Sequence, residues 1–113
     1  MKKKVLYLHG LESNHGGEKV GYLADNCYVH APKMDYTRKD IFAYLIQIME
    51  DFEPDLIIGS SMGGYTAHVL SGLYDTLSDK GYNTHNQIEV EQVDGMGHRI
   101  PLENFINQVM NDL

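Results

Sequence analysis

The spacing of apolar residues along the chain changes between patterns typical of strands and patterns typical of helices. Short β-prone runs predict strands at residues 5–8, 27–32 and 55–59. The run at 55–59 is of the continuous apolar kind that parallel sheets bury on both faces. Residues 88–93 alternate apolar and acidic side chains, which indicates a half-exposed strand at the edge of a sheet.

Three other segments have helical features. Residues 16–26 predict a helix after a glycine-rich loop. The clearest helix has apolar residues on one face at Ile41, Tyr44, Leu45, Ile48, Met49 and Phe52. Thr37 is expected to cap that helix, with Asp40 three residues on and Pro54 just beyond its end. A C-terminal helix is marked by Leu102, Phe105, Ile106, Val109, Met110 and Leu113.

The order of these elements predicts the fold class. Strands that alternate with helices indicate an α/β fold with a mostly parallel sheet. The chain has 113 residues without repeats, low-complexity tracts or a linker, so we expect a single domain over residues 1–113.

Charge and cysteine content exclude several classes of partner. The net charge of -7 argues against nucleic acid or an anionic membrane surface as a partner, because phosphate groups bind clustered Lys and Arg. No apolar stretch approaches the length of a membrane span. Cys27 is the only cysteine, so neither an internal disulfide nor a thiolate metal cluster is expected, which is consistent with a cytoplasmic setting.

The segment Gly59-Ser60-Ser61-Met62-Gly63 fits the pattern G-x-S-x-G directly after a predicted buried strand. This context is typical of a nucleophile elbow, where a strained turn from strand to helix lifts a serine hydroxyl to the edge of the sheet. Ser61 is the candidate nucleophile rather than Ser60, because only Ser61 has glycine at both minus two and plus two. Gly59, Gly63 and Gly64 would allow close backbone approach. The alternative is a glycine-rich turn that only connects a strand to a helix.

Two phosphate-binding turns do not fit this segment. A P-loop needs Lys-Ser or Lys-Thr after its glycines, and neither follows here. A GxGxxG dinucleotide turn is also absent from the sequence.

A nucleophilic serine needs a base, and the chain has six histidines. His98 lies in a glycine-rich loop between the last strand and the last helix, so it is the candidate base. His9 ends the first strand, where it suits shaping the loop that provides an oxyanion donor. Surface or structural roles are expected for His15, His30, His68 and His85. No metal is expected, since the histidines have neither i, i+4 pairing on a helix nor Cys–His spacing.

Three segments together, LYLHGLESN, DLIIGSSMGGY and VEQVDGMGHRI, resemble the α/β-hydrolase superfamily. More narrowly they are similar to its small bacterial and phage esterase-like branch, the YqiA/YcfP-like proteins (UPF0227). The resemblance implies a reduced three-layer α/β-hydrolase-like fold with helices on both faces of a short sheet. It also implies Ser61 as nucleophile, His98 as base, and the backbone N–H groups of Leu11 and Met62 as oxyanion donors. No cofactor is implied.

The chain departs from that family by being shorter between the elbow and the histidine. Asp75 is the candidate acid if residues 68–79 form an acid-bearing strand and turn. The same residues also fit the helix that must follow an elbow, and that helix would place Asp75 far from Ser61. Asp79, Asp94 and the absence of any acid within the chain are the alternatives.

The leading functional hypothesis is a serine hydrolase that acts on a small-molecule ester or thioester through an acyl-enzyme at Ser61. The alternative is a shortened, weak or inactive relative that binds a ligand or partner. Because a sheet that has lost strands exposes its edges, pairing with a second copy as a homodimer is one predicted way to cover them. A flavodoxin-like or Rossmann-like domain with an anion-binding turn is a third hypothesis, but it leaves His98 unexplained.

Overall fold

The computed structural model describes residues 2–10, 17–78, 89–92 and 102–110. In these ranges the strands are β1 (Lys4–Leu8), β2 (Tyr28–His30), β3 (Leu56–Gly59) and β4 (Glu89–Gln92). The helices are α1 (Glu18–Asn26), α2 (Ile41–Phe52), α3 (Met62–Ser78) and α4 (Leu102–Val109). Every strand and helix expected from the spacing of apolar residues is therefore present.

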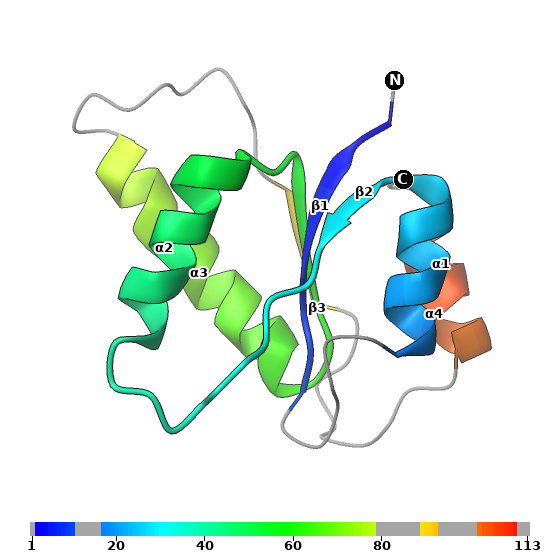
Figure 1. Ribbon diagram of the computed structural model, residues 1–113, viewed down its shortest axis with the longest axis horizontal. Helices are drawn as coiled ribbons and strands as arrows, with labels where there is room; N and C mark the ends of the chain where they lie inside the picture. The colour runs from blue at the N-terminus through cyan, green and yellow to red at the C-terminus, as the bar shows by residue number, and fades with distance from the viewer. Residues whose placement is uncertain (1, 11–16, 79–88, 93–101, 111–113) are drawn as a thin grey trace.

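The described strands form one parallel sheet with the order β2-β1-β3-β4 (Figure 1). The central pair is β1 and β3, in the register Val5↔Leu56 to Leu8↔Gly59. On the other side of β3, Gly59 is paired with Gln92 of β4. The edge position predicted for the last strand is thus confirmed, and the carboxyl ends of β1, β3 and β4 lie at the same edge of the sheet.

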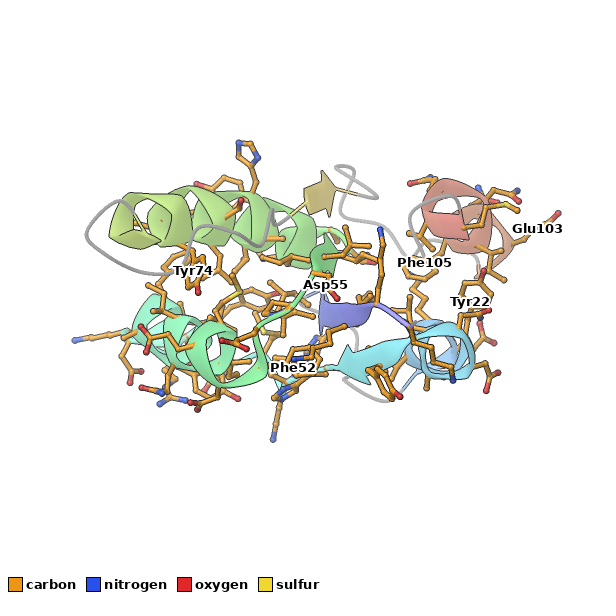
Figure 2. All side chains as sticks on the ribbon, turned by 90° about the horizontal axis from the view of Figure 1, so that it is seen from above. Tyr22, Phe52, Asp55, Tyr74, Glu103 and Phe105 are labelled. Atoms are coloured by element: carbon orange, nitrogen blue, oxygen red, sulfur yellow. The ribbon has the colours of Figure 1, made fainter. Side chains whose placement is uncertain are left out.

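Helices cover both faces of the sheet, which confirms the predicted reduced three-layer α/β fold (Figures 1 and 2). Alternate residues of a strand face opposite sides, so Tyr7 and Ile58 pack in the layer of α1 and α4, whereas Leu6 and Ile57 pack in the layer of α2 and α3. Phe105 of α4 is fully buried in the first of these cores.

The predicted cap of the second helix was wrong, because α2 begins after Asp40 rather than after Thr37. The backbone N–H and the hydroxyl of Thr37 both donate to Asp35 Oδ1, at 3.0 and 2.6 Å, which holds Thr37 in a turn before the helix. The Asp40 side chain makes no capping hydrogen bond, because its carboxylate accepts hydrogen bonds from the Arg38 guanidinium instead. At the other end, Glu53 adopts a left-handed conformation and Pro54 follows, as expected.

Residues 62–78 form the single helix α3, so the alternative of an acid-bearing strand over residues 68–79 was wrong. Ala67, Leu70 and Tyr74 recur at helical spacing and pack in the core with α2 and the sheet. That spacing buries one face of a helix continuously, and a strand over the same residues would divide these side chains between two faces.

No helix within the described residues is long and apolar enough to cross a membrane.

Candidate active site

Ser61 lies in the turn between β3 and α3, at the carboxyl edge of the sheet. Its φ of 58° is in the left-handed region, where a residue with a Cβ is strained by roughly 1–2 kcal/mol. Among the described non-glycine residues, only Ser61 and Glu53 have positive φ. Glu53 ends a helix, which accounts for its conformation, whereas the strain at Ser61 comes with the turn that presents its side chain.

Two glycines make this turn sterically possible. A Cβ on Gly59 would lie 2.1 Å from the carbonyl oxygen of Gly63, and a Cβ on Gly63 would lie 2.0 Å from that of Leu8. Neither position therefore accepts any larger residue without moving backbone. The first turn of α3 consequently packs directly against the end of β1.

Several backbone groups around Ser61 are hydrogen-bonded within the turn or to β1. Ser60 N–H donates to Leu8 O at 3.1 Å, Gly63 N–H to Ser60 O at 2.9 Å, and Gly64 N–H to Ser61 O at 3.0 Å. Within the described part of the chain, neither the Ser61 N–H nor the Met62 N–H has an acceptor, and the Met62 N–H is the predicted oxyanion donor. Because it also lies at the positive end of α3, this N–H suits an oxyanion.

The chain that leaves β1 passes beside the serine. A Cβ on Gly10 would lie 3.1 Å from Ser61 Cβ and 3.8 Å from Ser61 Oγ, so only a residue without a side chain fits there easily. Leu11, the other predicted oxyanion donor, is the next residue and lies outside the described residues. The loop that contains it therefore starts in contact with the candidate nucleophile.

His9 is buried next to Gly10, and both of its ring nitrogens are engaged in hydrogen bonds. Met34 N–H donates to Nε2 at 3.0 Å, so Nε2 is unprotonated there and Nδ1 carries the hydrogen that it donates to Gly10 O at 2.7 Å. This histidine is therefore not available as a base for Ser61. It fixes the start of the loop, in agreement with its expected role. His30 and His68 are exposed, as expected, and His15 and His85 lie outside the described ranges.

Two tyrosine hydroxyls support the turn, from the buried Tyr7 and the half-buried Tyr36, and the sequence patterns did not identify them. Tyr7 donates to Ser60 Oγ at 3.1 Å, and Tyr36 donates to the carbonyl oxygen of His9. The Tyr36 hydroxyl also contacts Thr66, whose own hydroxyl bonds to Met62 O. Burial raises the pKa of Tyr36 to about 12, and it raises the pKa of Tyr7 while the Ser60 hydrogen bond acts in the opposite direction. For Tyr7 the sequence does contain a signal, because a tyrosine inside an aliphatic strand needs a buried hydrogen-bond partner for its hydroxyl.

His98, the candidate base, lies outside the described residues. The chain leaves β4 at Gln92, whose partner Gly59 is two residues before Ser61. Six extended residues reach about 20 Å, and neighbouring strands are about 4.8 Å apart. The connection is therefore long enough for His98 to reach Ser61.

The described backbone does not bring Asp75 near Ser61. Asp75 lies in the fourth turn of α3, and a rise of about 1.5 Å per residue puts it about 20 Å along the axis from Met62. The alternative acids Asp79 and Asp94 lie outside the described residues. In the described ranges no group of three His, Cys, Asp or Glu could hold a metal ion.

Taken together, these features define a small parallel α/β protein with a strained serine turn between a buried strand and a helix. The model of an uncharacterised protein family, UPF0227, matches residues 4–78, and the protein belongs to this family. The matched residues run from β1 to the end of α3, so they include Ser61 and exclude β4, α4 and His98. No curated protein and no solved structure matches the chain.

Proposed function

We propose that this protein is a serine hydrolase of the α/β-hydrolase superfamily that acts on a small acyl ester or thioester. The observation that supports the proposal most strongly is the strained conformation of Ser61, with φ at 58°, between the fully buried strand β3 and helix α3. A turn that only connects a strand to a helix has no need of a non-glycine residue there, because glycine would adopt the same φ without strain. A strained residue at the sheet edge is typical of a functional site.

In the proposed mechanism, His98 accepts the Ser61 proton while Ser61 Oγ attacks the ester carbonyl carbon. His98 then donates the proton to the leaving alcohol or thiol, and an acyl-enzyme remains on Ser61. In the second half of the reaction, water activated by the same histidine attacks the acyl-enzyme and releases the carboxylic acid and free Ser61. The N–H groups of Met62 and Leu11 stabilise the negative oxygen of each tetrahedral intermediate. The mechanism uses no metal and no organic cofactor.

The proposal leaves Asp75 out of the catalytic residues. Its backbone position far along α3 argues against a role in orienting a histidine beside Ser61. The alternatives for the acid that orients His98 are Asp79, Asp94 or no acid within the chain. A serine–histidine pair without an acid still catalyses acyl transfer, though with a greatly reduced rate.

That position of Asp75 also favours the second candidate function, a weak or inactive relative that binds a ligand or partner. The two functions differ in a single respect that can be measured, which is whether Ser61 is activated. A binding module needs the fold of the turn, whereas a hydrolase also needs a nucleophilic Ser61 Oγ.

Covalent labelling with a fluorophosphonate separates the two. We expect the folded wild type to be labelled, Ser61→Ala to be unlabelled, and Ser60→Ala to keep its label at Ser61. Circular dichroism and thermal unfolding of each variant control for folding. A folded wild type that resists the probe would overturn the hydrolase proposal in favour of the binding module.

The proposed substrate is a small molecule and the proposed setting is the cytoplasm. Cys27, the only cysteine of the chain, is a free buried thiol that donates to Leu23 O at 2.9 Å. A buried thiol of this kind suits a reducing compartment without requiring one.

A further inference from the structure

We propose that Tyr7 is a positioning residue for the nucleophile, acting through its hydrogen bond to Ser60. The inference rests on the proposed function, because it assigns Tyr7 a part in the reactivity of Ser61. Tyr7 itself does not touch the substrate in this account. It holds the residue directly before Ser61, and so holds the strained turn in the conformation that presents Ser61 Oγ.

All the polar groups of Ser60 are engaged at once. Its N–H donates to Leu8 O, its carbonyl accepts from Gly63 N–H, and its hydroxyl accepts from Tyr7 at 3.1 Å. The two backbone bonds extend the pairing with β1 and close the first turn of α3. The hydroxyl bond is the only one of the three that is made by a side chain, so it can be removed without altering the backbone.

Because the hydroxyls of Tyr7 and Ser60 are buried, removing either one leaves the other without a hydrogen-bond partner. Tyr7 and Ser60 are each 3% exposed, so neither hydroxyl is well placed to replace its partner with bulk water. When one partner of a buried hydrogen bond is deleted, the other loses its partner without gaining water. The turn can then lower its energy by rotating Ser60 and letting Ser61 leave the strained φ, which moves Oγ away from the position needed for attack.

The Tyr7 ring is well fixed. Its backbone is in the central strand β1, where it pairs with Ile58, and its ring meets Phe105 edge to face with centroids 5.8 Å apart. Phe105 is fully buried and points from α4 into the core beside the sheet (Figure 2). The chain of contacts therefore runs from α4 through Phe105 and Tyr7 to Ser60. This gives α4, which lies outside the family match, a connection to the candidate nucleophile.

The test measures the second-order rate constant of fluorophosphonate labelling in Tyr7→Phe, Ser60→Ala and the double variant. Tyr7→Phe keeps the ring and its contact with Phe105 and removes only the hydroxyl. We expect each single variant to be labelled about tenfold more slowly than wild type, as loss of one buried hydrogen bond implies. The double variant should be no slower than the slower single variant, because both changes remove the same bond. With an ester substrate, kcat should fall by a similar factor while KM stays unchanged.

Tyr22→Phe is the matched control. Tyr22 packs against the same core from α1, so the control removes a tyrosine hydroxyl from the same layer without touching the turn. It should label at the wild-type rate. Should Tyr7→Phe fail to fold, Ser60→Ala removes the same bond from the other side and decides the question.

The outcomes separate the two claims. If wild type is labelled and both single variants are labelled as fast as wild type, Tyr7 has only a structural role and the inference is wrong. Single-variant losses that multiply in the double variant would also overturn it. If wild type is not labelled at all, the proposed function fails, and the inference fails with it.

Discussion

At the scale of single residues, Ser61 has a backbone conformation that opposes stability. A serine at φ 58° is held by the packing of the glycines and by the hydrogen bonds of Ser60, not by its own preference. Because the strain destabilises the fold, a role for the serine side chain would explain why the residue is not glycine. The stability of variants at position 61 therefore reports on the turn independently of any activity.

We expect Ser61→Gly to be more stable than Ser61→Ala by about 1 kcal/mol, because glycine adopts positive φ without strain and alanine does not. Urea unfolding of the two variants measures the difference in the free energy of unfolding. Neither variant has a hydroxyl at position 61, so both should resist the fluorophosphonate. Equal stability, or a more stable alanine variant, would contradict the strained geometry.

Tyr36 should make stability sensitive to alkaline pH. Its folded-state pKa of about 12 is higher than the ordinary 10.0, so the protonated hydroxyl is favoured by the fold. This contribution is complete below pH 10 and is lost as the pH rises through about 12. We expect the free energy of unfolding of wild type to fall more steeply than that of Tyr36→Phe between about pH 10 and about pH 12, the window between the ordinary and the folded-state pKa. Parallel curves for the two proteins in urea titrations would contradict this prediction.

At the scale of elements, the close approach of α3 to β1 determines where Ser61 lies. The contact is possible only because Gly63 has no side chain facing the carbonyl of Leu8. Gly72 lies in the same helix, and a Cβ at this position would have no neighbouring atom within 4 Å. The two positions therefore test opposite consequences of one substitution.

We expect Gly63→Ala to destabilise the protein by about 3 kcal/mol or more, because the new Cβ would have to displace backbone. Gly72→Ala should instead stabilise it by up to about 1 kcal/mol, through the higher helix propensity of alanine. Thermal and urea unfolding of both variants provide the comparison. A mild effect at Gly63 would mean that α3 does not pack against β1 as closely as described.

We expect Asp75→Asn to leave ester hydrolysis unchanged, because its backbone lies about four helical turns from the elbow. His98→Ala is the comparison, and it should abolish most of the activity. Loss of a true triad acid lowers kcat by about 10⁴-fold. A loss of that size in Asp75→Asn would show that Asp75 is the acid after all.

At the scale of the whole molecule, the periodicity of apolar residues was enough to predict the layers. The strands around Leu6 and Ile57 and the helix from Ile41 to Phe52 have strong local patterns, and packing reinforced them. The serine turn was also predictable, because G-x-S-x-G after a buried strand combines steric and positional requirements.

The remaining features depend on competing contacts, some of them between residues that are distant in the sequence. The bond from Tyr7 to Ser60 joins residues 53 positions apart, so a local pattern can indicate that the Tyr7 hydroxyl needs a partner but not that the partner is Ser60. Thr37 was expected to cap α2, but Asp35 competes for its hydroxyl and backbone N–H. Residues 68–79 had two interpretations until the core positions Ala67 and Leu70 could be placed against the sheet. The predicted pairing of two copies at exposed sheet edges stays a prediction.

The central claim is that Ser61 forms an acyl-enzyme, and rapid quenching tests it most directly. The folded wild type is mixed with p-nitrophenyl acetate, quenched with acid during the reaction and digested for peptide mass spectrometry. We expect one acetyl group on the peptide containing Ser61, localised to that residue by fragmentation and absent from Ser61→Ala. Release of p-nitrophenol without acylation of Ser61, or acylation at Ser60 instead, would contradict it.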